Sequence, residues 1–207
     1  MNTTTTCSQP WLFQTADLQA RELAEAELPA LQAFYDANPA YFMAVNGRPA
    51  GPDDARLEWE EQPPAHLSFT RRWFMGLYAH RQSGAPLAGV VVVLSDLCVP
   101  QAWHLGLFII ATELHGRDVA GPAYQALEDW ARAQGARWMR LGVVQGNSRA
   151  EAFWTRQGFI ELRTREGVDT GGRINTLSVR LKPLRADAAL DDYLRQAPRD
   201  QPGSTLP

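Results

Sequence analysis

Residues 138–159 read WMRLGVVQGNSRAEAFWTRQGF, and this stretch decides the fold. Its first seven residues are mostly apolar and end before a glycine-bearing turn, which predicts a buried strand. Ser148 and Glu151 have the spacing of a capping box, so we expect a helix that begins at Ser148. Gln157-Gly158 then ends that helix, because glycine readily takes the left-handed conformation that follows a last turn. The stretch therefore predicts a strand, a turn and a helix.

A second strand–turn–helix precedes it. The apolar residues 104–110 predict a strand, and residues 122–134 place their apolar side chains at helical spacing. The connection between them contains Gly116, Arg117 and Gly121. A glycine-bearing turn at a helix N-terminus can bind an anion through backbone N–H groups and the helix dipole. Taken alone, the same pattern also fits an ordinary strand–helix turn.

The remaining chain adds strands and helices around these two units. Residues 72–80, 87–94 and 103–110 predict three antiparallel strands, with turns at 83–86 and 98–100. Before them we expect a strand at 18–23 and helices at 27–37 and 53–61, the first of which ends at Asn38-Pro39. Residues 159–165 and 174–181 predict a hairpin. The order indicates one mixed α/β domain at 16–182, between a flexible segment at 1–15 and a tail at 183–207 that contains at most one helical turn, at 190–194.

Composition excludes several classes of protein. The chain has 207 residues, 20 Lys plus Arg and 23 Asp plus Glu, for a net charge of −3. No basic excess is present to bind a nucleic-acid backbone. The two cysteines provide neither a disulfide framework nor a CxxC metal site. No apolar run approaches the roughly 20 residues of a membrane span, and no secretory signal is evident, so we expect a cytoplasmic protein.

Six residues of the decisive stretch follow the pattern N-x-x-A-x-x-[FL]-[YW]-x-x-x-G-F. They are Asn147, Ala150, Phe153, Trp154, Gly158 and Phe159. In this pattern the chain resembles the GNAT superfamily of N-acetyltransferases. Residues 115–120 then fall at the family's pyrophosphate motif, Q/R-x-x-G-x-G/A. The resemblance implies a mostly antiparallel central sheet of six or seven strands with helices on both faces, splayed between strands 4 and 5 at 103–110 and 138–144.

The resemblance also implies acetyl-CoA as cosubstrate and an amine as its partner. Backbone groups of Phe108, Ile109 and Ile110 would then bind the pantetheine arm. The pyrophosphate would lie on residues 115–121, which are His115, Gly116, Arg117, Asp118, Val119, Ala120 and Gly121. By the same family pattern Asn147 would contact the cofactor or order the site, Ala150 would also be a cofactor-binding residue, and Phe153 and Trp154 would lie near the thioester end. Homodimers are common in the family, and we expect no metal.

Four positions depart from the family pattern. His115 replaces the usual Gln or Arg, and Asp118 stands where a second glycine is usual. Since a carboxylate would repel a pyrophosphate, we expect Asp118 to cap the following helix rather than point to solvent. Trp154 replaces the tyrosine that serves many members as the general acid, and an indole N–H does not transfer a proton at neutral pH. Gly142 lies near the place of a glutamate base in other members.

His104 remains as the candidate base. Strand alternation places it on the same face as Phe108, four residues later, and an imidazole with a pKa near 6.5 can accept a proton at pH 7. A structural histidine is an equally good interpretation. Glu58, Glu60 and Glu61 would attract a cationic amine, although a solvated helix face explains them as well. The aromatic residues at 34, 35, 41 and 42, beside Asn38, fit a core better than a pocket.

The sequence thus predicts an N-acetyltransferase that transfers an acetyl group to a primary amine of a small molecule or peptide. The mechanism implied by the resemblance is direct attack in a ternary complex. Two alternatives remain open: a non-catalytic acyl-CoA-binding or interaction module with the same fold, and a GNAT-like fold that binds no CoA. At the strand ends, Arg140 and Gln145 would either contact a substrate or be solvated.

Overall fold

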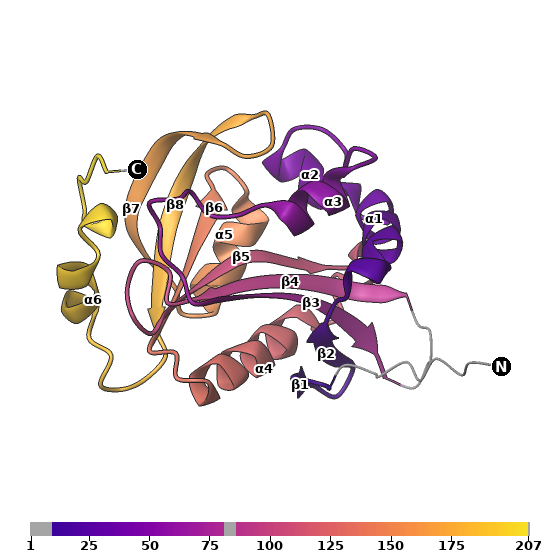
Figure 1. The fold of residues 1–207 in the computed structure, drawn as a ribbon, viewed down its shortest axis with the longest axis horizontal. Helices are drawn as coiled ribbons and strands as arrows, with labels where there is room; N and C mark the ends of the chain where they lie inside the picture. The colour runs from indigo at the N-terminus through magenta and orange to yellow at the C-terminus, as the bar shows by residue number, and fades with distance from the viewer. Residues whose placement is uncertain (1–9, 81–85, 207) are drawn as a thin grey trace.

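The computed structural model describes residues 10–80 and 86–206, and within them the chain forms one eight-stranded sheet (Figure 1). The strand order is β1-β2-β3-β4-β5-β6-β8-β7, and every neighbouring pair is antiparallel except β5–β6. The strands are β1 Phe13–Gln14, β2 Leu18–Glu22, β3 Arg71–Ala79, β4 Leu87–Ser95, β5 Ala102–Ile110, β6 Trp138–Val144, β7 Ile160–Asp169 and β8 Ile174–Pro183. The mostly antiparallel sheet is confirmed, with more strands than the six or seven expected.

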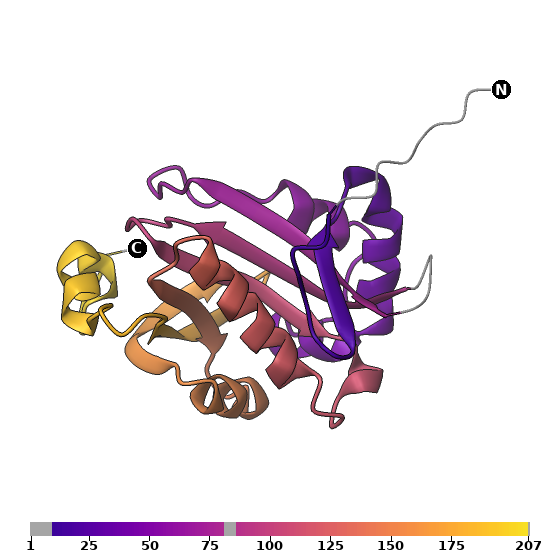
Figure 2. The same cartoon turned by 90° about the horizontal axis from the view of Figure 1, so that it is seen from below.

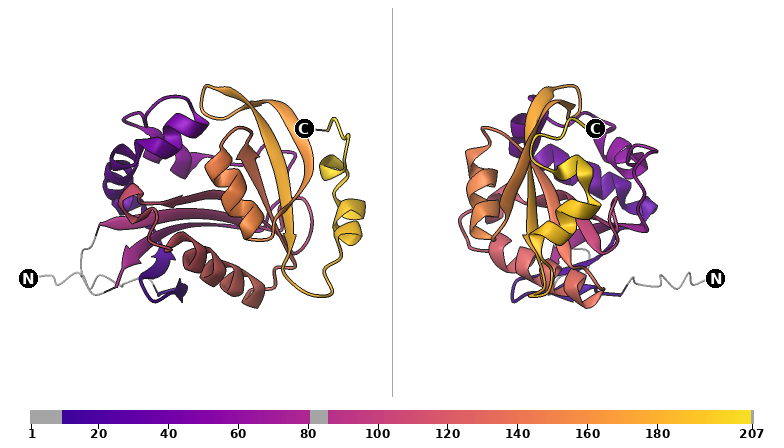
Figure 3. Two further views of the ribbon diagram at one scale, coloured as in Figure 1. Left: turned by 180° about the vertical axis from the view of Figure 1, so that it is seen from behind. Right: turned by 90° about the vertical axis from the view of Figure 1, so that its left-hand side faces the viewer.

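Helices cover both faces of the sheet, as predicted. On one face lie α1 Leu28–Ala37, α2 Pro39–Val45 and α3 Asp54–Glu60, and on the other lie α4 Ala120–Ala133 and α5 Ser148–Arg156 (Figures 2 and 3). Short 3-10 turns stand at Glu25–Glu27 and Thr112–Leu114. Asn38-Pro39 ends α1 as expected, but Pro39 also begins α2, because its fixed φ suits the first turn of a helix. The turn predicted at 83–86 falls largely outside the described residues.

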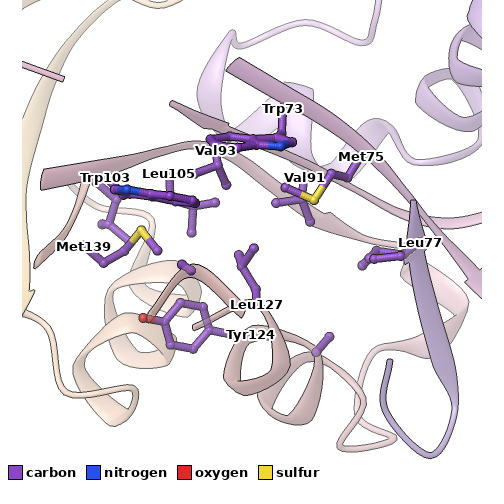
Figure 4. Packing of buried hydrophobic residues seen from close by; sticks show 14 of the residues in the cluster. Trp73, Met75, Leu77, Val91, Val93, Trp103, Leu105, Tyr124, Leu127 and Met139 are labelled. Atoms are coloured by element: carbon purple, nitrogen blue, oxygen red, sulfur yellow. The ribbon is translucent and has the colours of Figure 1, made fainter. Parts of the chain in front are cut away.

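The larger apolar core lies between the sheet and α4 (Figure 4). Trp73 of β3 stacks on Trp103 of β5 with ring centroids 4.8 Å apart, and Tyr124 and Leu127 of α4 are fully buried against the same face. The opposite face packs on α1, where Leu31 and its neighbours form a second core. Burial on both faces explains why β4 is apolar along nearly its whole length.

The C-terminal segment is more ordered than predicted. It forms the helix α6, Leu190–Gln196, and a 3-10 turn at Pro198–Asp200, beside the outer strands of the sheet (Figure 1). Tyr193 is buried against Trp138, whose indole N–H donates to the Ala189 carbonyl at 3.2 Å. The expectation of one helical turn at 190–194 was therefore too modest. Apolar side chains at 188, 193 and 197 give this segment a core of its own to pack against.

Candidate functional site

A gap opens where β5 and β6 separate. The two parallel strands pair only from Ala102–Leu105 against Trp138–Leu141. Beyond that point β6, β7 and β8 turn away from β3, β4 and β5 (Figure 1). A cavity of about 840 Å³ follows this gap, lined by α2, α3 and strands β5 to β8. The predicted splay between these two strands is therefore confirmed, and the cavity lies at it.

A bulge in β5 lies at the mouth of the gap. Val92 and Val93 of β4 pair with Leu107 and Leu105, so Gly106 is an extra residue in β5. Because of it, Trp103 and Leu105 face α4, whereas Leu107 and Ile109 face α1. Phe108 packs with the α4 core. The prediction that His104 and Phe108 share a face is therefore wrong, since the inserted residue reverses the alternation between them.

The connection after β5 presents unpartnered backbone donors. No described residue accepts a hydrogen bond from the N–H groups of Gly116, Asp118, Val119, Ala120 or Gly121. Three of these amides belong to the cap and first turn of α4, where an anion is also favoured by the helix dipole. Gly116 has φ +80°, and a Cβ added to it would meet no atom within 4 Å. The loop is thus an open, donor-rich cradle that fits a pyrophosphate.

Two side chains of this loop behave differently from a family consensus. Asp118 is exposed and in the left-handed region, with φ +54°, and makes no capping hydrogen bond to α4. The preferred prediction that Asp118 caps the helix is therefore wrong, since Val119 occupies the cap position. The Nε2–H of His115 donates a hydrogen bond to the Ile110 carbonyl at 2.9 Å. Burial, and then the charge of Arg149, lowers the pKa of His115, so it ties the loop to β5 as a neutral ring.

Asn147 caps α5. Its side-chain oxygen accepts from the Ala150 N–H at 3.2 Å, and Glu151 accepts from the Gly146 N–H at 3.0 Å. The helix begins at Ser148 as predicted, but its cap is Asn147, so the capping box was placed one residue late. Asn147 and Ala150 both line the cavity. The asparagine thereby holds the N-terminus of α5 against the gap.

Comparisons with known proteins agree with this geometry. Residues 12–159 match the family model described as the acetyltransferase (GNAT) family. The chain belongs to the GNAT family. The prediction of an N-acetyltransferase enzyme is thus confirmed at the level of the family. A comparison with curated proteins finds no match by sequence.

Solved structures of GNAT proteins share the fold at low sequence identity. A probable GNAT acetyltransferase from Chromobacterium violaceum has a TM-score of 0.67 at 16% identity, covering 84% of this chain and 87% of that one. An acetyltransferase from Thermus thermophilus has a TM-score of 0.61 at 22% identity, with coverage of 80% and 96%. Spermidine N-acetyltransferase from Vibrio cholerae, in complex with CoA and spermine, has a TM-score of 0.61 at 14% identity, with coverage of 82% and 97%.

In this GNAT chain, Trp154 belongs to the core. Its indole is buried and packs edge-on against Phe108, Tyr124 and Phe159, with ring centroids 5.6, 5.2 and 5.3 Å away. Phe153 stacks on Phe108 at 6.0 Å. Trp154 also lines the cavity at its α5 side. The aromatic cluster gives the gap a rigid apolar wall, and Trp154 supplies volume there rather than an acidic proton.

His104 lies beside a buried ion pair. Arg140 donates to Asp200 through Nε at 2.6 Å and Nη2 at 2.9 Å, and its Nη1 lies 3.3 Å from His104 Nδ1. Burial, and then the positive charge of Arg140, lowers the pKa of His104 to about 3. Arg140 is therefore no solvated strand end, because Asp200 of the C-terminal segment neutralises it inside the protein. The imidazole lines the cavity as a neutral ring.

Glu58 faces the same cavity from α3. Its side chain is 30% exposed, and burial followed by the nearby Glu61 carboxylate raises the pKa of Glu58 to about 7. The aromatic residues behind it serve two roles. Tyr35 and Phe42 are buried in the α1-side core, yet both also line the cavity beside Tyr41. The expected core packing is confirmed, and the same side chains form a cavity wall.

Asn38 is buried beside the aromatic cluster, and its side chain makes two hydrogen bonds there. Its amide donates to the Phe34 carbonyl at 2.7 Å, and its oxygen accepts from the Thr112 N–H at 2.6 Å. It thus anchors α1 to the segment that precedes the anion cradle. Sequence reasoning missed Arg165, which also lines the cavity. The spacing of Arg163 and Arg165 in a predicted strand was the available signal, since residues two apart share a face.

Among residues 10–80 and 86–206, no helix is both long enough and apolar enough to span a membrane.

Proposed function

We propose that this protein transfers the acetyl group of acetyl-CoA to a primary amine of a small molecule or peptide, by direct attack in a ternary complex. One observation carries the proposal: the unpartnered amides of Gly116 and of residues 118–121 come just after the end of β5 that has separated from β6, across one 3-10 turn. A polyanionic thioester held at this cradle would lie along the gap, and the acceptor cavity opens into the same gap. The two substrates would therefore meet beside the bulge at Gly106.

The cradle and the strand β5 would bind different parts of the cofactor. Residues 115–121 would bind the pyrophosphate, and backbone groups of Phe108, Ile109 and Ile110 would bind the pantetheine amides. Asn147 would order the N-terminus of α5, with Ala150, Phe153 and Trp154 near the thioester end. When bound, acetyl-CoA supplies the acetyl thioester. Backbone N–H groups near the β5 bulge are suited to stabilise the charge that develops on its carbonyl oxygen.

Proton removal from the amine has two candidate groups in this cavity. His104, the base predicted from the sequence, is held neutral and accepts hydrogen bonds, but a pKa of about 3 matches a base at pH 7 poorly. Glu58, with a pKa raised to about 7 by burial and Glu61, matches that task better. We propose Glu58 as the group that takes the proton and His104 as a neutral hydrogen-bonding group that lines the same cavity. Loss of turnover in Glu58→Gln but not His104→Gln would support this division, and the reverse would restore His104 as the base.

The proposal is tested in two steps. Tight binding of acetyl-CoA to the native state should raise the melting temperature, and the rise should grow with ligand concentration. Thiol release with a broad panel of primary amines then measures transfer. A melting temperature that does not move at saturating acetyl-CoA would contradict the cofactor assignment. A large shift without thiol release from any amine would contradict the catalytic one.

A non-catalytic acyl-CoA-binding module is the second candidate. Two observations favour it: Trp154 is a buried core residue without a transferable proton, and Gly142 offers no side chain to the cavity. A thiolate is nevertheless a fair leaving group, with a thiol pKa of about 8.5, so transfer can proceed without a general acid. The pair of assays above separates the two candidates. The cytoplasmic location and a homodimer stay predictions.

A further inference from the structure

A second cavity joins the first at the bulge. It measures about 370 Å³ and extends from the junction toward residues 61–67, β4 and the C-terminal segment. Eight residues line both cavities: Tyr41, Glu58, Glu61, His104, Gly106, Leu107, Arg140 and Arg165. The acceptor space therefore continues past the gap between β5 and β6. Its walls carry charges of opposite sign on opposite sides.

The basic side is made by arginines from β7 and the C-terminal segment. Arg165 is half-buried and lines both cavities, and its guanidinium forms no hydrogen bond or ion pair with any described residue. Arg199 lines the second cavity; its Nη1 contacts the Cys98 sulfur at 3.4 Å, and its buried Nε has no partner in the described part of the chain. Burial, and then the charges of Arg199 and Arg163, lowers the pKa of Arg165. The positive charge here is in excess.

Asp200 does not balance that excess. Its carboxylate already accepts two hydrogen bonds from Arg140 and one from Tyr193, so it pairs with Arg140. Arg163 instead donates to the carbonyl oxygens of Ser204 and Leu206. Within the described ranges, no carboxylate lies within 4.0 Å of the guanidinium groups of Arg163, Arg165 or Arg199. An anion bound from solution would neutralise the excess positive charge of these arginines.

The acidic side lies on and just after α3. Glu58 and Glu61 line both cavities, and Arg72 contacts Glu58 only at 3.9 Å because its guanidinium donates to the carbonyls of Glu58 and Trp59, at 2.5 and 2.7 Å. Behind Glu58, the Tyr35 hydroxyl is buried, lines the first cavity and has no partner among the described residues. In the described chain no ion pair within 4.0 Å joins Glu58 or Glu61 to Arg165 or Arg199. The acidic side is compensated only in part, by Arg72, and the basic side by no carboxylate within that distance.

We propose that the acetyl acceptor is a small molecule that carries an oxyanion as well as its primary amine, with the oxyanion on Arg165 and Arg199 and the amine on the Glu58 side. This inference rests on the proposed function and names the substrate class of the same site. A guanidinium binds carboxylate and phosphonate oxygens through paired hydrogen bonds, so both chemistries fit. A polyamine would leave the arginines unpaired and add positive charge beside them. The site is therefore selective against polyamines.

The test compares matched amines that differ only in the anion. L-Amino acids and ω-amino acids of graded chain length, their primary amides, the corresponding aminoalkylphosphonates, and spermidine are offered with acetyl-CoA, and kcat/KM is read from thiol release. We expect at least about a tenfold preference for one oxyanion-bearing series over its amides, since a charge-assisted hydrogen bond is worth about 10- to 150-fold. The carboxylate and phosphonate arms identify the oxyanion. Equal or better rates with the amides or spermidine would overturn the inference.

Variants assign the preference to the arginines. Arg165→Gln should lower kcat/KM for the preferred oxyanion substrate by about 10- to 150-fold and leave the rate with its amide unchanged. Arg156→Gln on the exposed surface of α5 removes the same charge away from the cavity and serves as the control. Arg199→Gln offers a second variant if the first does not fold. Equal losses with acid and amide would overturn the assignment, because a general structural defect does not discriminate between them.

Failure of the proposed function gives a different result. If no amine releases thiol, the same compounds are titrated calorimetrically into wild-type protein and Arg165→Gln. Binding of an oxyanion-bearing amine that the amide does not share, and that the substitution abolishes, would support the inference without transfer. Absence of any such binding would overturn the inference too. A thermal shift with acetyl-CoA, measured separately, shows whether the cofactor assignment survives either outcome.

Discussion

Replacement of Asp200 by Asn should destabilise the protein severely although it alters one atom of a C-terminal turn. Asp200 is 1% exposed and accepts three hydrogen bonds, two from Arg140 and one from Tyr193. Burial opposes its charge, but the Arg140 and Tyr193 hydrogen bonds outweigh that cost and lower the pKa of Asp200. The substitution leaves the Arg140 guanidinium buried beside His104 without a counter-charge. The neighbouring imidazole, neutral at pH 7, cannot replace it.

The magnitude follows from that uncompensated charge. Breaking a buried ion pair by removing one partner costs about 3–5 kcal/mol. For a domain of this size, each kcal/mol shifts the melting temperature by about 2–4 °C, so Asp200→Asn should melt about 6–20 °C lower than wild type. Asp191→Asn, at an exposed position of α6, makes the same chemical change and should shift the melting temperature by no more than about 2 °C.

Calorimetry and urea unfolding of both variants measure the effect. A double variant, Arg140→Met with Asp200→Leu, serves as a second comparison, because replacing both partners with apolar groups removes the buried charge as well as the bond. We expect it to be more stable than Asp200→Asn alone. The reasoning is refuted if Asp200→Asn has the same melting temperature as the Asp191→Asn control, since the Asp200 carboxylate would then contribute nothing to the stability of the native state.

Three further substitutions test the site. Glu58→Gln should remove the rise of kcat/KM with pH below about 7 in a pH–rate profile, because the proton-accepting carboxylate is populated above its raised pKa and lost below it; an unchanged profile would contradict this role. Asn147→Ala should cost about 1 kcal/mol in urea unfolding through loss of the α5 cap, with Asn46→Ala, which caps no helix through its side chain, as comparison. Gly116→Ala should cost about 1–2 kcal/mol of stability because of its positive φ, and weaken the acetyl-CoA thermal shift as well; a normal shift would separate the cradle from cofactor binding.

Local patterns in the sequence predicted most of the fold. The strands expected at 72–80, 87–94 and 103–110 match β3, β4 and β5 to within a residue or two, because apolar runs bounded by turns depend only on neighbouring residues. The GNAT motif at 147–159 likewise rests on one strand–turn–helix. Both predictions depend on short stretches of sequence, and the structure contains the elements that they predict.

Such local patterns could not predict ion pairs between residues that are far apart in the sequence. Arg140 and Asp200 are 60 residues apart, and each alone has the sequence context of a solvated residue, Arg140 in a strand and Asp200 in a Pro-rich tail. The packing of Tyr193 and Ala197 in one core with Trp138 brings Asp200 to Arg140. The sequence therefore could not show that the C-terminal segment borders the second cavity through Arg199 and neutralises Arg140 through Asp200.

The inserted residue in β5 explains why strand alternation predicted the wrong face for His104 relative to Phe108. Strand alternation assigns faces only where the register is unbroken, and a single bulge exchanges them for every residue beyond it. Gly106 places His104 with Glu58 and the arginines in the acceptor space, while Phe108 turns to the aromatic core. The same bulge stands where β5 loses its pairing with β6. One backbone irregularity thus coincides with the separation of β5 from β6 and also decides which side chains of β5 face the second cavity.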